Sequence, residues 1–335
     1  MTAVRLPVFF RFAPLLFVMF TSLAFAQGYD ATPQGRALIE EMVTKHGYDQ
    51  ERLEALLADA TRIDRILESI SRPAEKTLTW QEYRKIFIKP ERVERGLKFL
   101  KEHDGAFARA ESEFGVPATV IAAIIGVETW YGKYTGNYRV MDALATLAFD
   151  YPPRSRFFRS ELVQYLLMTR EQGFDPLDIK GSYAGAMGYG QFIASSYRHF
   201  AIDFDGDGIA DILTNPVDAI GSVANYFSAH HWRGGESIAE PLGGHLPVDS
   251  PLLTPGLKPK LTVTDYRTAG LEPVLMPSDD APARAILLQG REGPELWLTY
   301  HNFYVITRYN HSHLYAMAVL QLADELNKHR NPDRW

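Results

Sequence analysis

The segment Val116–Val127 carries no charged side chain, and Glu128 follows directly at its end. Pro117 suits the first turn of a helix, where the N–H that proline lacks is not needed. A helix that is apolar on all faces is a buried helix, and this one is shorter than the roughly 20 residues that a membrane span needs. The pattern therefore predicts a buried helix that stops near Gly132 and carries a carboxylate on its end.

Helical spacing of apolar residues continues on both sides of this segment. Before it, residues 27–100 are predicted to be helical, and Thr79 with Glu82 has the spacing of a capping box. The segment Pro90–Phe114 is predicted to be one further amphipathic helix. After the central segment, the same spacing predicts helices at Val140–Phe149, Ser155–Gln172, Ala219–His230 and Leu314–Lys328.

A change of composition begins at Gly234-Gly235, and residues 247–286 are rich in Pro, Thr, Val and Leu. Lys260–Thr264 and Ala285–Leu288 have the pattern of short strands. We expect a mainly α (α+β) fold with a small β insert. The expected domains are a helical supporting domain at 27–112 completed by 310–335, a core at 113–232, and a β-rich insert with a return segment at 233–309.

The first 26 residues have the pattern of an export signal. Arg5 and Arg11 are basic, Phe12–Phe20 is largely apolar, and Ala24-Phe25-Ala26 fits the small-x-small cleavage pattern. An uncleaved anchor is the alternative. The chain has no Cys, so it has neither disulfides nor a cysteine to carry a lipid. The formal net charge of −6 gives no electrostatic reason to bind nucleic acid.

Glu128 is the strongest candidate for catalysis. Burial disfavours the charged form of a carboxyl group, and the negative end of a helix dipole acts in the same direction. A Glu that stays protonated near neutral pH can act as a general acid. The alternative is an ordinary Glu that reaches solvent at a helix end.

The run Lys180–Ile193 combines many Gly and Ala residues, which permit close approach of the backbone. Its glycines do not have the spacing of a dinucleotide-binding loop, and no strand precedes them. A flexible loop is one interpretation. The other is a binding loop whose side chains contact a ligand, namely Met187, Tyr189, Gln191 and Phe192.

Residues 203–211 match the front half of an EF-hand calcium loop. Asp203, Asp205 and Asp207 occupy positions 1, 3 and 5, and the backbone carbonyl of Ile209 occupies position 7. Position 12 is Thr214 instead of the usual Glu, so the next available carboxylate is Asp218. Clustered carboxylates repel one another, which favours a bound cation over a solvated turn.

Four pieces of the chain together resemble the lytic murein transglycosylases of the B type, within the lysozyme-like superfamily. The first two pieces are Gly126–Gly132 and Gly185–Phe192 with Ser195–Tyr197, and the last two are Pro216–Phe227 and Ile306–His311 with Tyr315. The resemblance implies a lysozyme-like catalytic core that cleaves peptidoglycan glycan strands. The best-known members carry a lipid on an N-terminal Cys, which this chain lacks, so the resemblance implies a soluble periplasmic enzyme here.

The resemblance also implies roles for single residues. Glu128 protonates the glycosidic oxygen, and Ser182 hydrogen-bonds the N-acetyl group of the substrate. Arg154 meets a peptide or lactyl carboxylate, and Asp218 closes the calcium loop. The glycan groove is implied to be lined by Gln191, Tyr226, Tyr309, Asn310 and Tyr315.

Two other functions remain open at this point. A muramidase that hydrolyses the same bond needs a second acid, and Asp142, Asp150 and Glu161 give no argument for pairing with Glu128. A peptidoglycan-binding protein without turnover would keep the groove only. We expect a monomer with a structural Ca²⁺ and no organic cofactor, whose partners are glycan strands and other cell-wall enzymes.

Overall fold

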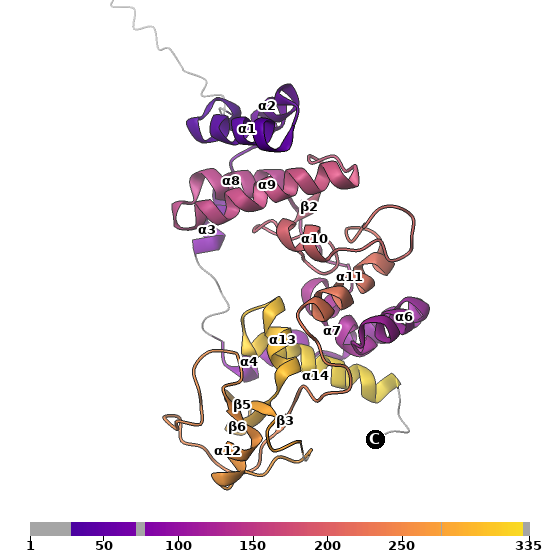
Figure 1. The fold of residues 1–335 in the computed structure, drawn as a ribbon, viewed down its shortest axis with the longest axis vertical. Helices are drawn as coiled ribbons and strands as arrows, with labels where there is room; N and C mark the ends of the chain where they lie inside the picture. Colours follow the sequence, from indigo (N-terminus) through magenta and orange to yellow (C-terminus); the bar gives the residue numbers. More distant parts are fainter. Residues whose placement is uncertain (1–27, 72–77, 276, 331–335) are drawn as a thin grey trace, which may run out of the picture.

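The computed structural model describes residues 28–71, 78–275 and 277–330, and within these ranges the chain is mainly helical (Figure 1). The predicted signal peptide at 1–26 lies outside the described residues. No single helix in the described ranges has the length and apolar character of a membrane span. The required length and apolar character are reached only by a pair of helices taken together, Asp104–Phe114 and Ala118–Thr129, and this pair is bent by 115°.

One layer of the fold joins the first helices of the chain to two helices from its middle (Figure 1). It contains α1 (Pro33–His46), α2 (Gln50–Asp59), α3 (Asp64–Ser71), α8 (Val140–Asp150), α9 (Ser155–Gln172) and the 3-10 turns Tyr29–Ala31 and Pro152–Arg154. Arg159 on α9 pairs with Glu41 on α1 at 2.6 Å. Tyr48 Oη donates to the carbonyl of Leu166 at 3.2 Å, so α1 and α2 are fastened to α9.

The second layer surrounds the central helix, α7 (Ala118–Thr129). It contains α4 (Trp80–Phe87), α5 (Pro90–Glu102), α6 (Asp104–Phe114), α11 (Pro216–Ala229), α13 (His301–Tyr309) and α14 (His313–Arg330). Helices α5, α6, α11 and α14 all contact α7. Every residue of α7 from Val120 to Val127 is buried, which confirms the prediction made from its uncharged sequence.

The segment 27–112 is divided between these two layers, whereas the sequence suggested one supporting domain. α3 packs on α8, while α4 and α5 pack on α14. An amphipathic pattern gives the buried face of each helix but not the helix that covers it. The predicted helix Pro90–Phe114 is also two helices, because the backbone leaves the helical conformation at His103 (φ −118°, ψ 27°).

The predicted β insert is present as a four-stranded antiparallel sheet with the order β3-β6-β5-β4. Its strands are β3 (Ala239–Pro241), β4 (Leu261–Thr262), β5 (Pro282–Gln289) and β6 (Pro294–Thr299). The strand predicted at Lys260–Thr264 is shorter, because Thr262 and Asp265 form a capping box that starts α12 (Val263–Thr268). The insert has its own small hydrophobic core, which includes Tyr266 and Leu298.

A short two-stranded ribbon brings the Gly-rich loop to the end of α7. β1 (Tyr138–Arg139) pairs with β2 (Lys180–Gly181) in antiparallel register. The loop after β2 leads into α10 (Ala194–Phe200). A Cβ on Gly136 would lie 2.0 Å from the backbone carbon of Gly181, so glycine is required where the two segments meet.

Candidate active site

Glu128 lies in the last turn of α7, and the chain leaves this helix through a left-handed turn. Trp130, Tyr131 and Gly132 have φ values of 54°, 58° and 78°. Glycine adopts such values without strain, whereas each of the two L residues pays a conformational penalty on the order of 1 kcal/mol. Strained backbone next to a half-buried carboxylate is typical of a functional site.

Thr129 connects this turn to the Gly-rich loop, a role that the sequence analysis missed. Its Oγ1 donates to the carbonyl of Tyr189 at 2.9 Å and accepts from the N–H of Gly132 at 2.9 Å. A Cβ on Gly132 would lie 2.1 Å from Tyr189, so the turn and the loop are in close contact. The only signal in the sequence is a hydroxyl residue directly after the candidate acid.

Tyr315 contacts Glu128 directly. Its Oη donates to Glu128 Oε1 at 2.6 Å. The Tyr315 side chain is 2% exposed, and burial together with the charge of Glu128 holds its pKa well above the usual value. The hydroxyl therefore remains a hydrogen-bond donor across the physiological pH range. Tyr315 was predicted to line the groove; in the structure its side chain is buried, and its hydroxyl supports Glu128.

The segment from the C-terminal part of the chain folds back onto the site, as the resemblance implied. The Tyr309 ring stacks on Tyr315 with an interplanar angle of 8°, and its Oη donates to the carbonyl of Gly190 at 2.6 Å. Tyr226 Oη donates to the carbonyl of Arg308 at 2.7 Å, and burial raises the pKa of Tyr226 to about 12. The three tyrosine rings thus form one packed cluster beside Glu128.

Ser182 is held by the turn that follows it. Its Oγ accepts hydrogen bonds from the N–H groups of Ala184 at 3.3 Å and Ala186 at 3.0 Å. The position of the oxygen is therefore fixed by the backbone. The side chain is half-buried, so its hydroxyl proton can be donated to a ligand.

Gln191 is held in a comparable way. Its φ of 51° is left-handed, and its Nε2 donates to the carbonyls of Thr135 and Gly188, both at 3.0 Å. The contact with Thr135 ties the loop after α7 to the Gly-rich loop. Because the amide nitrogen is used, the amide oxygen is the group of Gln191 that can accept a hydrogen bond from a ligand.

Met187 and Phe192 are corrected from ligand contacts to core residues. Their side chains are 0% and 3% exposed, and their backbones exchange hydrogen bonds of 2.9 and 3.0 Å. The Phe192 ring packs 5.9 Å from that of Tyr309. Both residues therefore support the loop from inside. Tyr189 and Asn310 are half-buried and keep part of their surface open.

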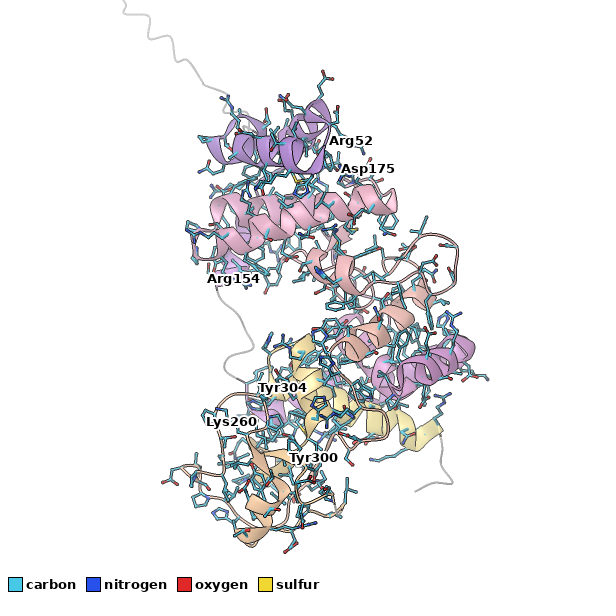
Figure 2. All side chains as sticks on the ribbon, in the orientation of Figure 1. Arg52, Arg154, Asp175, Lys260, Tyr300 and Tyr304 are labelled. Carbon is cyan, nitrogen blue, oxygen red and sulfur yellow. The ribbon has the colours of Figure 1, made fainter. Side chains whose placement is uncertain are left out.

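Arg154 lies in the other layer of the fold, in the turn before α9 (Figure 2). Its side chain is exposed, and the guanidinium stands 4.4 Å from the Phe157 ring centroid and 5.1 Å from that of Phe158. A stacked, exposed guanidinium can still form a bidentate pair with a carboxylate.

The three other acids near the centre of the sequence have structural partners. Asp142 accepts from Arg139 at 2.7 and 2.9 Å and caps the N–H of Thr61. The remaining two are bound in the same manner, Asp150 by Tyr29 and Arg62, and Glu161 by the N–H of Ser195. Each one fastens segments that are distant in sequence, so their role is structural.

Three carboxylates converge in the loop that resembles an EF-hand. One oxygen from each of Asp203, Asp205 and Asp218 lies within 4.8 Å of the others. Asp218 is fully buried, and this desolvation raises its pKa although backbone N–H groups oppose the shift. A hard cation suits such a set of oxygens. Asp207 lies outside this group, and one of its oxygens accepts from the N–H of Ile209 at 2.9 Å.

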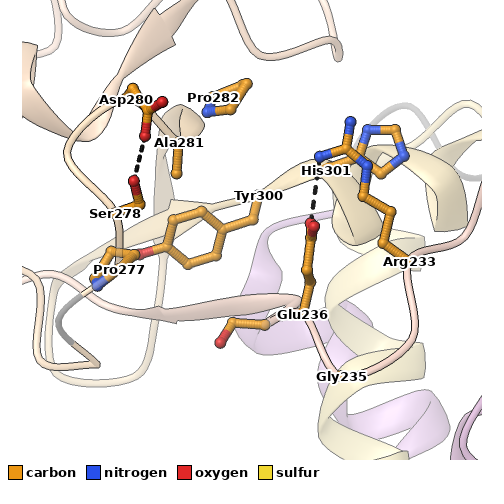
Figure 3. A pocket seen from close by; sticks show the side chains of 11 residues that line it. Arg233, Gly235, Glu236, Pro277, Ser278, Asp280, Ala281, Pro282, Tyr300 and His301 are labelled. Atoms are coloured by element: carbon orange, nitrogen blue, oxygen red, sulfur yellow. Dashed lines mark hydrogen bonds and ion pairs between the residues drawn. The ribbon is translucent and has the colours of Figure 1, made fainter.

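A cavity of about 460 Å³ lies elsewhere, where the insert meets α13 (Figure 3). Arg233 and Glu236 pair on one side of it at 3.4 Å, and Tyr300 and His301 form another part of its wall. None of the residues predicted for catalysis or binding lines this cavity.

Comparisons with known proteins agree with this geometry. Residues 31–324 match the family described as the transglycosylase SLT domain. The chain is 44% identical over 299 residues to the membrane-bound lytic murein transglycosylase B of Escherichia coli (strain K12), which covers 87% of this chain and 81% of that protein. The structure of the lytic transglycosylase SltB1 from Pseudomonas aeruginosa matches with a TM-score of 0.87 and 48% identity, over 90% of this chain and 99% of that one. The Escherichia coli lytic transglycosylase SLT35 in complex with calcium matches with a TM-score of 0.84 and 43% identity, over 91% and 96% of the two chains.

Proposed function

We propose that Glu128 is the single acid and base in the cleavage of peptidoglycan glycan strands. The chain belongs to the transglycosylase SLT domain family. The bond cleaved is the β-1,4 link from N-acetylmuramic acid to N-acetylglucosamine. The reaction consumes no water, and the new end is a 1,6-anhydro-N-acetylmuramic acid. The lysozyme-like fold that the chain shares with lytic transglycosylases supports this reaction.

The observation that carries the proposal is a half-buried Glu128 bound by Tyr315, while the other acids considered have structural partners. Most glycosidases use two carboxyl groups about 5 to 9.5 Å apart. Asp142, Asp150 and Glu161 are each held by neighbouring donors, so none is available for that second role. A mechanism with one carboxyl group fits this arrangement.

In the first step, the Glu128 carboxyl donates its proton to the glycosidic oxygen while the bond from that oxygen to C1 breaks. The carbonyl oxygen of the substrate's own acetamido group supports the positive charge at C1. In the second step, the Glu128 carboxylate takes the proton of the 6-hydroxyl group, whose oxygen bonds to C1. Glu128 ends protonated, as it began. The Tyr315 hydroxyl stabilises the carboxylate between the two steps.

Ser182 and Gln191 are proposed to orient the substrate. The Ser182 oxygen is fixed by two N–H groups, which supports donation of its hydroxyl proton to the acetamido carbonyl. The amide oxygen of Gln191 would accept from a sugar hydroxyl or N–H. The partly exposed side chains of Tyr189, Tyr309 and Asn310 would line the groove, and Arg154 would meet a carboxylate of the peptide or lactyl group.

A structural Ca²⁺ is proposed in the loop at 203–218. Asp203, Asp205 and Asp218 supply converging carboxylates, and the relative SLT35 has been solved in complex with calcium. Asp207 and the carbonyl of Ile209 are the expected additional ligands. The cation would neutralise the buried carboxylate of Asp218 and hold the loop against α11.

The periplasm is the proposed location, after removal of residues 1–26. The related proteins include a membrane-bound lytic transglycosylase and other lytic transglycosylases. The absence of Cys from this sequence favours a soluble form. We further propose a monomer that acts on glycan strands beside other cell-wall enzymes.

Mass spectrometry of the muropeptides released from purified sacculi tests the reaction. Anhydro-muramic termini, which resist borohydride reduction, are expected as the main product. Reducing termini would contradict the proposal and indicate a hydrolase with a second acid. Binding to sacculi without any release would indicate a protein that binds peptidoglycan without turnover.

A further inference from the structure

Arg92 on α5 is a buried cation without an acidic partner among the described residues. Its side chain is 6% exposed, and it takes part in none of the ion pairs of the described ranges. Its Nη1 donates to the carbonyl of Ile86 at 3.0 Å, and its Nε has no hydrogen-bond partner there. A buried charge left without a counter-charge is costly, so this position calls for an explanation.

The guanidinium of Arg92 lies over Trp130, the left-handed residue that ends the catalytic helix. The distance from its Cζ to the Trp130 ring centroid is 4.4 Å, and the Phe87 ring lies 5.1 Å away. A cation over an aromatic face is favourable, and more so where water is excluded. Arg92 therefore holds Trp130 from the side of α5.

Two further residues of the same face of α5 hold Tyr131. Arg92, Gly96 and Phe99 are spaced i, i+4 and i+7, which puts them on one face of the helix. A Cβ on Gly96 would lie 2.2 Å from Tyr131 Oη, and the Phe99 ring centroid lies 5.5 Å from that of Tyr131. One face of α5 thus contacts both Trp130 and Tyr131, the two non-glycine residues with a left-handed backbone that follow Glu128-Thr129.

The left-handed turn closes the helical turn that carries Glu128. The N–H of Trp130 donates to the carbonyl of Gly126 at 3.1 Å, and the N–H of Tyr131 donates to that of Ile125 at 3.3 Å. The first is a regular helical bond, whereas the second forms because the left-handed conformation of Trp130 turns the N–H of Tyr131 back over the helix end. If Trp130 left that conformation, the last turn of α7 would open and Glu128 would move relative to Tyr315.

We propose that Arg92 is a positioning residue for the reaction: its guanidinium holds Trp130 in the left-handed conformation and thereby fixes the carboxyl group of Glu128. The inference rests on the proposed function of Glu128. It assigns no contact between Arg92 and the substrate. The desolvation cost of the unpaired charge offsets the favourable contact with the rings, so we expect Arg92 to serve the geometry of the site rather than its net stability.

Arg92→Met separates the two roles. Met is similar in length to Arg and removes the unpaired charge. If the role of Arg92 were only structural, the variant would lose only the activity that follows from lower stability. We expect kcat on soluble glycan strands to fall by about 10- to 100-fold, while KM changes by less than about twofold and Tm does not fall. Arg92→Lys should recover part of kcat, because it keeps a cation over the ring but not the planar stack.

Lys98→Met is the matched control, since Lys98 is 73% exposed on the same helix and should leave kcat unchanged. Trp130→Leu should lower kcat as Arg92→Met does, and the double variant should be no worse than either, because both changes break one contact. Additive losses in the double variant, or wild-type kcat in Arg92→Met, would overturn the inference. An inactive wild-type enzyme, or an active Glu128→Gln variant, would instead contradict the proposed function.

Discussion

Tyr315 Oη donates to Glu128 Oε1 at 2.6 Å, across 187 positions of the sequence. The bond joins the first turn of α14 to the last turn of α7. The hydroxyl is buried beside Tyr309, which stacks on it. The orientation of the candidate acid is therefore set by a residue from the far end of the chain.

Tyr315→Phe should lower kcat by about 10- to 100-fold, because a hydrogen bond to a charged group is worth about 1.5–3 kcal/mol. The ring remains, so the packing against Tyr309 and the fold should be kept. Steady-state kinetics with matched circular dichroism spectra check this. Since the pKa of Tyr315 is well above the usual tyrosine value, the wild type should lose no activity near pH 10 through ionisation of this residue.

Glu128→Gln should lower turnover by at least about 10³-fold, because the amide can neither donate nor take the proton. Gln has nearly the same shape and can still accept from Tyr315, so Tm should change by only about 1–2 °C. Release of muropeptides and a thermal melt on one protein sample give both values. Wild-type turnover in a folded Glu128→Gln protein would rule out the mechanism.

Ser182→Ala should slow the reaction without changing its product. The hydroxyl orients the acetamido group but does not choose the nucleophile that captures C1. The 6-hydroxyl group is already in the site, which gives it an advantage over water on the order of several kcal/mol. Chromatography of the products should therefore show fewer anhydro ends and no new reducing ends. A switch to reducing ends would mean that Ser182 excludes water.

Calcium should raise Tm, because a ligand bound only by the folded state stabilises that state by about 2.7 kcal/mol at 100 times its Kd. Asp203→Ala should remove the response, while Asp249→Ala, an exposed acid of the insert, should keep it. Thermal melts in millimolar calcium and in chelator make the comparison. Equal Tm values for the wild type in both would indicate a solvated turn.

The calcium response should also depend on pH. The folded protein holds the pKa of Asp218 above its unfolded value, so without metal its contribution to stability is present at low pH and is lost as pH rises through the folded pKa. Calcium binds the ionised form and offsets that loss. The difference in Tm between calcium and chelator should therefore be larger at pH 7 than at pH 5. A difference that grows on acidification would contradict this account of Asp218.

The parts that the sequence predicted well are those set by local rules. The uncharged run before Glu128 required a buried helix, and the capping box at Thr79 and Glu82 forms as expected. α9 has the bounds that its apolar spacing indicated.

The parts that it missed depend on contacts between distant segments. Nothing near Met187 indicates that the loop turns this side chain inward, where it is fully buried. The hydroxyl of Tyr315 could be placed in the site by resemblance, but its bond to Glu128 Oε1 appears only when α14 lies on α7. The helix predicted across His103 also breaks there, and the two parts lie against different helices, α5 against α14 and α6 against α11.

The dependence of α7 on α14 has a consequence for the life of the chain. A protein that crosses a membrane unfolded emerges from its N-terminal end, and α14 is the last helix of the described residues to emerge. Until then Glu128 lacks Tyr315, and the apolar surface of α7 is only partly covered. Contacts between segments so far apart in the sequence are slow to form. If the chain is exported as proposed, Glu128 gains the bond that orients it only after α14 has emerged, and we expect a product that ends before His313 to lack that bond.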